Sequence, residues 1–359
     1  METLWLRRED KASESRVALT PDGVSTLVQN GVHVIAQRSA ERIFSDQEYR
    51  AAGAELTDAH WRQAPADAVI LGLKELAESD VAIAHTHIYF SHSFKGQSGA
   101  GAVLKAYADG GGDLFDLEFL QDDQGRRIAA FGYWAGFVGA ALGVLGHAHY
   151  QNSNLPYPAA HRYSSQQHLV DAVKDALGGQ PLRVMIMGAL GRCGTGATDL
   201  LRELGDKVAI SAWDLPEFAA AEKPIRAIIE HDVFINCVYL RQPISPMIDQ
   251  ALLAENTCLK IISDVSCDPN NPNNPIAVYD ASTSLDVPFR RAAGSAAWPV
   301  HVQAIDHLPT LLPREASQEF AAALLPHLLE FMISPGLPTV WRNAKAHFAE
   351  AKQRYGLSA

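Results

Sequence analysis

Two charged residues directly follow a short apolar run in the first half of the chain. Lys74 and Glu75 come immediately after residues 69–73, which are hydrophobic apart from one glycine. Side chains at the carboxyl end of a parallel strand point into the crevice in which α/β folds bind their ligands. Lys74 is therefore well placed for proton transfer or for binding a carboxylate. The alternative is an exposed lysine that opens a loop.

Three histidines, His85, His87 and His92, fall within eight residues. Close histidines can ligate zinc, but no Asp, Glu or Cys completes an obvious ligand set beside them, so we predict no metal. A single catalytic histidine explains the stretch more simply, because imidazole titrates near neutrality, as a general acid or base must. His92 is the best candidate, since it follows its predicted strand at loop distance.

A small set of basic residues stands out in a chain whose formal net charge is −11. The set comprises Lys11, Arg16, Arg126 and Arg127. Because guanidinium binds carboxylate in a bidentate fashion, Arg16 and Arg127 are candidate clamps for an anionic substrate. The alternative for any one of them is a solubilising surface charge.

The sharpest local motif is a hydrophobic run that leads into a glycine-rich turn and then a helix. The turn has the spacing G-x-x-G-x-x-G, with Gly188, Gly191 and Gly194. Such a turn lets the backbone approach a pyrophosphate, which the N–H groups of the helix N-terminus bind. Asp214 ends the next strand 26 residues after Gly188, where a carboxylate binds ribose hydroxyls and repels a 2′-phosphate. The motif predicts NAD rather than NADP; a purely structural turn is the alternative, and Arg192 either neutralises the pyrophosphate or is a solvated loop charge.

Periodic apolar segments predict that these residues are carried by two successive α/β series. In the first series Thr20 caps a helix that opens at Pro21. Strands are predicted at residues 4–7, 32–36, 69–73, 81–85 and 113–116, and further helices at 45–52 and 100–109. Short strands separated by helices predict a parallel sheet with crossover connections.

The second series follows residues 135–143, a run of small residues suited to close helix packing or to a helix that bridges two domains. Gly178 and Gly179 end a helix predicted at 168–177. Further strands are predicted at 182–187, 208–214, 233–237 and 261–265, and helices at 195–204, 315–331 and 340–355. The predicted fold class is α/β.

Size and composition limit the class of protein. A chain of 359 residues with a hydrophobic fraction of 47% suits two domains with their own cores. Its acidic charge disfavours nucleic acid and anionic membranes as partners. No basic and apolar leader opens the sequence and no run of 18 apolar residues occurs, so we expect a cytoplasmic protein. The four cysteines show no metal-type spacing and are expected to be buried, reduced thiols.

Several segments together resemble the lysine-forming saccharopine dehydrogenase family, within the alanine dehydrogenase/transhydrogenase-like superfamily. The resemblance runs from about Leu6 to Arg342. The segments that carry it are residues 14–21, 72–75, 116–120, 123–132, 188–194 and 305–315, in the family's order. The blocks at 123–132 and 305–315 are the most specific.

The resemblance implies two Rossmann-like domains, each a doubly wound parallel sheet, with a cleft between them. The C-terminal helices are then expected to return to the first domain, which periodicity alone does not show. The expected organisation is a substrate and catalytic domain of residues 1–134 plus 316–359, and a dinucleotide-binding domain of residues 135–315.

The activity implied by the resemblance is the NAD-dependent, reversible oxidation of saccharopine to L-lysine and 2-oxoglutarate, in lysine biosynthesis by the alpha-aminoadipate pathway. Lys74 and His92 match the acid–base pair, which serves imine and carbinolamine intermediates. The implied substrate contacts are Arg16, Gln97, Arg127 and Phe131. The residues implied to tune the pair are Lys11, Glu14, Glu75, Lys95, Glu118 and Asp306. The implied nucleotide contacts are Arg126, Gly188, Gly191, Arg192, Gly194, Asp214, Tyr239, Val265, Ile305, Asp306, His307 and Leu308.

The resemblance also implies that Cys193 and Cys237 can form a disulfide beside the nucleotide. Phe218 departs from the family pattern, where a hydroxyl residue would contact the ribose. The expected partners are the small-molecule substrates, with no nucleic acid or membrane; a monomer is feasible and a homo-oligomer stays open. Two alternative functions are an alanine-dehydrogenase-like or opine-type enzyme that uses a different amine, and a non-catalytic regulator that senses NAD.

Overall fold

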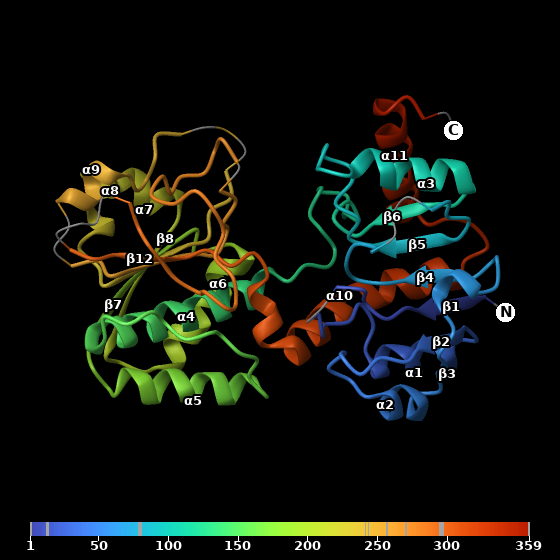
Figure 1. Cartoon of the computed structure of the whole chain (residues 1–359), viewed down its shortest axis with the longest axis horizontal. Helices are drawn as coiled ribbons and strands as arrows, with labels where there is room; N and C mark the ends of the chain where they lie inside the picture. Colours follow the sequence, from blue (N-terminus) through green and yellow to red (C-terminus); the bar gives the residue numbers. More distant parts are fainter. Residues whose placement is uncertain are drawn as a thin grey trace. The chain divides into compact units, whose positions relative to one another are not determined.

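The computed structural model describes residues 2–11, 14–77, 81–240, 242, 244–255, 258–269, 271–293 and 298–357. Two compact units make up the chain (Figure 1): residues 1–130 with 316–359 form the first, and residues 131–315 form the second. The described part of each unit contains a six-stranded sheet. No helix in the described part of the chain has both the length and the hydropathy needed to cross a membrane.

The first unit is built on a parallel sheet whose winding direction reverses at its centre. The order is β3-β2-β1-β4-β5-β6, and every neighbouring pair is parallel. The strands are β1 (Thr3–Leu6), β2 (His33–Gln37), β3 (Glu55–Thr57), β4 (Val69–Leu71), β5 (Thr86–Tyr89) and β6 (Leu114–Asp116). The chain winds outward from β1 in one direction and from β4 in the other. The carboxyl ends of β1 and β4 therefore form the switch point at which doubly wound folds bind ligands, and residues 7–11 and 72–75 leave the sheet there.

The strand predicted at residues 81–85 is wrong, because the strand of this region is β5. The N–H of Ile83 donates to the carbonyl of Ala106 (2.9 Å), and the carbonyl of Ile83 accepts from the N–H of Gly112 (3.0 Å). The backbone of Ile83 is thus bonded to helix α3 (Ala100–Gly110) and to the turn after it, not to a neighbouring strand. The apolar run that suggested a strand therefore bonds to a helix end through Ile83.

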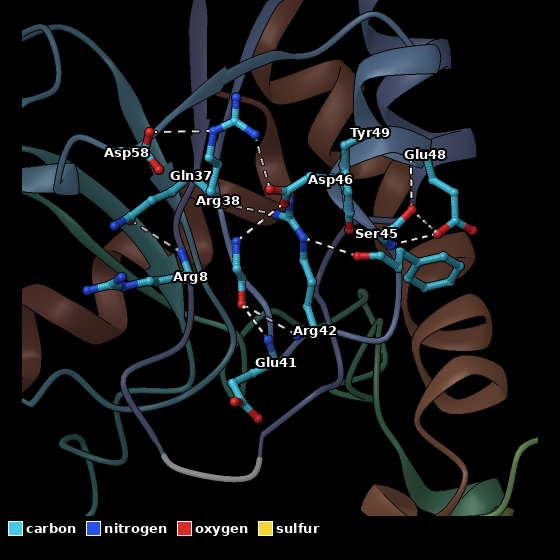
Figure 2. A network of polar contacts seen from close by, with 12 residues as sticks. Arg8, Gln37, Arg38, Glu41, Arg42, Ser45, Asp46, Glu48, Tyr49 and Asp58 are labelled. Atoms are coloured by element: carbon cyan, nitrogen blue, oxygen red, sulfur yellow. Dashed lines mark hydrogen bonds and ion pairs between the residues drawn. The ribbon is translucent and has the colours of Figure 1, made fainter.

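Helices of the first unit begin where the capping residues predict. Helix α1 (Pro21–Gln29) follows Thr20, whose hydroxyl accepts from the N–H of Gly23 (3.3 Å). Helix α2 (Asp46–Ala51) follows Ser45, which forms a reciprocal capping box with Glu48 (Figure 2). Strand β3 and the 3-10 turn η1 (Trp61–Gln63) were not predicted, because both are too short to show a period.

The last two helices, α10 (Pro313–Ile333) and α11 (Thr339–Arg354), bring the chain end back to the first unit from residue 316 onward. Trp341 packs edge-on against Phe115 of β6, with ring centroids 5.4 Å apart. Phe348 stacks on Phe94 at 6.1 Å. Figure 1 shows α11 beside α3 and β6. The first hydrophobic core therefore includes residues more than 200 positions apart in sequence.

The second unit has the order β11-β12-β10-β9-β7-β8, which is parallel except for the pair β11–β12. Its strands are β7 (Leu182–Met187), β8 (Val208–Trp213), β9 (Val233–Asn236), β10 (Ile261–Asp264), β11 (Arg290–Arg291) and β12 (His301–Gln303). Its helices are α4 (Gly132–Asn152), α5 (Gln166–Leu177), α6 (Arg192–Glu203), α7 (Leu215–Ala220), α8 (Pro224–Ile228), α9 (Gln250–Ala254) and the 3-10 turn η2 (Leu308–Leu311). Winding reverses between β7 and β9, so the glycine turn after β7 lies at the switch point.

The small residues of α4 allow it to pack closely on α6. A Cβ on Gly136 would collide with the carbonyl oxygen of Cys193, and a Cβ on Gly196 would collide with that of Tyr133. Close helix packing, one of the two interpretations of the small-residue run, is thus confirmed. Helix α4 lies within the second unit.

Candidate active site

Lys74 lies just beyond β4 at the switch point of the first sheet, where it is half-buried. Burial lowers its pKa, and the positive charges of Arg16 and Lys11 lower it further. The negative charges of Glu14 and Glu75 oppose this shift but do not cancel it. The structure thus gives Lys74 the direction of pKa shift that a lysine needs to accept a proton near neutrality.

Arg16 is buried beside Lys74 and is held by Glu14. The guanidinium binds the carboxylate through two bonds, Nε to Oε1 at 2.9 Å and Nη2 to Oε2 at 2.6 Å. The N–H of Arg16 also donates to Glu14 Oε1 at 3.0 Å. Burial raises the pKa of Glu14, but the bonds and charge of Arg16 outweigh it and hold that pKa below its ordinary value. Glu14 therefore fixes the orientation of the Arg16 guanidinium, the predicted substrate clamp, before any substrate binds.

His92 follows β5. Glu75 interacts with both His92 and Lys74 and so links the two. Its Nε2 lies 3.5 Å from Oε1 of Glu75, and both side chains are roughly two-fifths exposed, at 42% and 44%. The negative charge of Glu75 also acts on Lys74. Among the described non-glycine residues, only His92 has a positive φ, 51°. Left-handed backbone costs a non-glycine residue about 1–2 kcal/mol, and such strain is concentrated at functional sites.

Asp116 is a residue of this site that the sequence analysis missed. It is fully buried at the end of β6, and burial raises its pKa. Its Oδ2 accepts from the hydroxyl of Ser91 at 2.6 Å, and that hydroxyl is 2.7 Å from the hydroxyl of Ser93. Its Oδ1 accepts from the N–H of Glu118 at 2.8 Å. Asp116 therefore anchors the residues on both sides of His92. A carboxylate at the last position of a predicted buried strand was the signal.

Glu118 binds basic residues from the segments that follow β5 and β6. Its carboxylate pairs with Lys95 at 2.9 Å and also accepts from Arg127. Burial raises the pKa of Glu118, but these neighbours outweigh it and lower the pKa overall. Gln97 supports the same loop, because its Oε1 accepts from the N–H of Lys95 at 2.8 Å. These predicted residues are thus brought together around Glu118, on which the charge of His92 also acts.

Three further residues that the sequence analysis discussed, Arg126, Phe131 and His87, have the following surroundings. Arg126 is exposed on the first unit and pairs with Asp122 at 2.9 Å. Phe131 lies at the start of α4 in the second unit. His87 is fully buried against Trp61, with ring centroids 4.5 Å apart, and burial lowers its pKa well below its ordinary value.

His85 is also buried, and its Nε2 is 3.2 Å from the carbonyl of Ala64. Of the three clustered histidines, His92 is the one that pairs with Glu75. No group of three or more His, Cys, Asp or Glu residues that could hold a metal ion occurs in the part of the chain that the structure describes.

The glycine turn of the second unit has the shape that a dinucleotide requires. Gly188 follows β7 with φ +83°, and a Cβ on Gly194 would collide with the carbonyl oxygen of Gly188. A Cβ on Gly191 would meet only that same oxygen, at 3.5 Å, so the turn is open on its outer side. Gly191 is also the N-cap of α6 and has no side chain to occupy this helix end, where an anion can bind the helix N-terminus. The turn therefore fits a pyrophosphate.

Asp214 directly follows β8 and is the N-cap of α7, beside this turn. Its Oδ2 accepts from the N–H of Leu190 at 3.1 Å, and its Oδ1 accepts from the N–H of Leu215 at 2.9 Å. Its position is thus fixed on the glycine turn, while lone pairs are left for ribose hydroxyls. The neighbouring Glu217 completes a capping box and adds a second negative charge that disfavours a 2′-phosphate.

The remaining predicted nucleotide residues follow other strands of the same sheet. Tyr239 follows β9 and is 62% exposed, and Val265 follows β10. The segment 305–308 follows β12; Ile305 and Leu308 are buried, and Asp306 and His307 are not. Because these strands are parallel to β7, all these residues lie at the edge that carries the glycine turn.

The four cysteines are free thiols. Burial raises the pKa of Cys193 to about 11. Burial also raises the pKa of Cys237 well above its ordinary value, and the charge of Cys193 adds to that shift. Both thiols are therefore weak nucleophiles in this form. The disulfide between them that the resemblance implies stays a prediction.

Comparison with known proteins places the chain first in a broad class. A family model described as alanine dehydrogenase/PNT, N-terminal domain, matches residues 5–138. Among solved structures, an L-alanine dehydrogenase gives a TM-score of 0.70 at 17% identity and covers 98% of this chain and 99% of its own. A transhydrogenase from Sinorhizobium meliloti gives 0.63 at 17% identity, with 92% and 94% covered. At these identities the likeness shows the fold, which is that of the alanine dehydrogenase and transhydrogenase class.

Curated relatives narrow the class to one family. A Yarrowia lipolytica protein named saccharopine dehydrogenase [NAD(+), L-lysine-forming] is 44% identical over 366 aligned residues, which cover 98% of both chains. The Schizosaccharomyces pombe protein of the same name is 43% identical, with the same coverage. The chain belongs to the family of L-lysine-forming, NAD(+)-dependent saccharopine dehydrogenases.

Proposed function

We propose that this protein is an NAD-dependent dehydrogenase that oxidises saccharopine reversibly to L-lysine and 2-oxoglutarate. Relatives that carry this name match nearly the whole chain at up to 44% identity. The observation that carries the proposal is the grouping of Lys74, Glu75 and His92. One carboxylate borders both an amine whose pKa is lowered and an imidazole. Proton transfers to and from nitrogen and oxygen need two such groups.

The dinucleotide supplies an acceptor for the hydride from the glutaryl Cα of saccharopine. Gly188, Gly191 and Gly194 would hold its pyrophosphate, with Arg192 beside them, and Asp214 would bind its adenosine ribose. Phe218 provides no hydroxyl for that ribose, so Asp214 takes the main polar role. The further contacts proposed for the dinucleotide are Arg126, Tyr239, Val265, Ile305, Asp306, His307 and Leu308.

Lys74 takes the proton of the secondary amine as the carbon–nitrogen bond is oxidised to an imine. This role requires the neutral amine, which the lowered pKa makes available. His92 removes a proton from the water that adds to the imine and passes it to nitrogen. As the carbinolamine collapses, His92 takes the hydroxyl proton and Lys74 returns its own proton to the leaving nitrogen. Glu75 borders both groups, and its negative charge favours the protonated form of Lys74. Lysine and 2-oxoglutarate are then released.

The anionic substrate needs cations in an acidic protein. Saccharopine carries three carboxylates, and Arg16 and Arg127 are the guanidinium groups that we assign to them, with Gln97 and Phe131 as neighbouring contacts. Glu14 orients Arg16, and Glu118 orients Arg127 and Lys95. Lys11 and Asp306 complete the charged residues assigned to the site.

A comparison of amine and oxo-acid pairs tests this function. NADH oxidation with 2-oxoglutarate plus lysine is expected to exceed oxidation with pyruvate plus ammonium at least a hundredfold, and NADPH is expected to replace NADH poorly. Preference for pyruvate and ammonium would assign an alanine-dehydrogenase-like reaction, and a different preferred amine an opine-type reaction. NADH binding without turnover of any pair would assign a regulator. A cytoplasmic location stays a prediction, and both a monomer and a homo-oligomer stay open.

A further inference from the structure

Arg7 leaves the end of β1 and crosses over the exit of β4 at Gly72. Its side chain is fully buried, and a Cβ on Gly72 would collide with its guanidinium. Glycine at position 72 therefore makes the crossing possible. Beyond it, Nη2 of Arg7 donates to the carbonyl oxygen of Lys74, and the guanidinium lies 5.6 Å from the ring centroid of Tyr89. A cation from one strand is thus bonded to the backbone of the candidate base.

Glu9 binds the same stretch of backbone from the other side. Its Oε1 accepts from the N–H of Leu73 at 2.8 Å, and its Oε2 accepts from the N–H of Lys74 at 2.8 Å. Arg7 pairs with that same Oε2 at 3.3 Å. Together, Arg7 and Glu9 bind both polar backbone groups of Lys74. Asp10 extends the contact by accepting from the N–H of Ala77 at 3.2 Å.

This arrangement is a costly way to stabilise a fold. Burial raises the pKa of Glu9, which shows that its ionised form is disfavoured there despite the charge of Arg7. Buried ion pairs can often be replaced by apolar residues without loss of stability. The strands β1 and β4 are already joined by their own ladder. The pair therefore adds little to strand association and much to the geometry of residues 73–74.

We propose that Arg7 and Glu9 are positioning residues for Lys74, which fix its backbone so that its amine stays in the half-buried place beside Arg16. Without them, the chain after β4 is free to turn, and the lysine side chain reaches water. The effect on turnover rests on the proposed function, because it requires Lys74 to be the base. The effect on the amine itself does not.

Turnover gives the first test. Glutamine at position 9 keeps the size and one acceptor oxygen, but its NH2 group faces a backbone N–H. Glu9→Gln is expected to lower kcat about tenfold and to leave the KM for NADH within about twofold. In a Lys74→Met background it should cause no further loss, because both changes remove the same function. Losses that multiply in the double variant would overturn the proposal.

Chemical labelling of Lys74 gives a second test that needs no turnover. Acylation by trace acetic anhydride, measured by mass spectrometry at several pH values, reports the neutral fraction of the amine. Since burial is the largest cause of its lowered pKa, release into water should raise that pKa and reduce the labelling at a given pH. Arg7→Lys keeps the charge but loses the planar guanidinium, and it should also raise the pKa of Lys74. This variant replaces Glu9→Gln in the test if Glu9→Gln does not fold. An unchanged titration would overturn the proposal. So would a fall, which would mean that Glu9 acts through its charge.

A similar buried pair provides the control. Arg42 is 5% exposed, pairs with Asp46, and donates to the carbonyls of Phe44 (3.2 Å) and Gln37 (3.1 Å) (Figure 2). It holds the loop after β2 and has no bond to Lys74. Asp46→Asn should lower the melting temperature and leave the labelling of Lys74 unchanged.

The control also separates the possible failures. Equal labelling shifts in Asp46→Asn and Glu9→Gln would indicate general loosening and would overturn the positioning role. If Lys74 responds to Glu9 as expected but the unmodified protein turns over no saccharopine, the positioning role stands and the proposed function fails. If the protein turns over saccharopine but the labelling of Lys74 does not change, the proposed function stands and the positioning role fails.

Discussion

Replacing Asp116 by alanine tests whether the unusual backbone of His92 contributes to activity. The φ of 51° at His92 stores about 1–2 kcal/mol, and the bonds from Asp116 to Ser91 hold one side of that turn. Without this anchor the loop can relax to an ordinary conformation. A gain of about 1–2 kcal/mol on relaxation leaves roughly one molecule in 5 to one in 30 with His92 in place. We therefore expect kcat to fall by about 5- to 30-fold.

The assay is steady-state NADH oxidation with lysine and 2-oxoglutarate, together with a melting curve for each variant. Asp116→Asn, which keeps the shape and one acceptor oxygen, should show a smaller loss and serves if the alanine variant does not fold. Asp113→Ala is the matched control, because Asp113 precedes the same strand and pairs with Lys345 at 2.6 Å. The control should keep its kcat. An unchanged kcat in folded Asp116→Ala, or an equal loss in the control, would refute the reasoning.

Three further predictions address the base, the clamp and the stability of the fold. Lys74→Met should lower kcat at least tenfold in the same assay, and unchanged turnover would remove Lys74 from the mechanism. Arg16→Ala should raise the KM for 2-oxoglutarate and leave that for lysine nearly unchanged; equal rises in both would contradict its role as a clamp. Burial raises the pKa of Asp264 from 3.8 to about 6, so the protonated carboxyl favours the folded state. Its stabilisation is complete below about pH 4 and is lost as the pH rises through about 6, a change of about 3 kcal/mol. Urea unfolding of Asp264→Asn should lack this component of pH dependence, and an unchanged profile would contradict the assignment.

Elements with a clear boundary signal could be predicted from the sequence. The helix after Thr20 and the helix that ends at Gly178 begin and end as their caps predict. The strand–turn–helix at Gly188 is also correct, because the need for tight turns dictates its residues. The prediction of a strand at residues 81–85 was wrong, because an apolar run does not show whether its backbone bonds to a strand or to a helix end.

The candidate site was predicted in part, and the missing part has a common cause. Lys74 could be found because a charged residue directly after an apolar run is conspicuous, and His92 because an imidazole titrates near neutrality. Arg7 and Glu9 could not, since their role depends on which strands are neighbours. Strand β1 lies beside β4 although more than 60 residues separate them, and no local pattern contains that adjacency. Glu9 therefore reads as an ordinary surface charge until the sheet order is known.

The central claim is that hydride passes between the dinucleotide and the glutaryl carbon of saccharopine. NADH dideuterated at the nicotinamide C4 tests it directly, in a mixture of unlabelled lysine, 2-oxoglutarate and the purified protein. Mass spectrometry is expected to find saccharopine that carries one deuterium on the glutaryl Cα, and Lys74→Met should form it at least tenfold more slowly. Deuterium in a product other than saccharopine, or no deuterium transfer at all, would contradict the account.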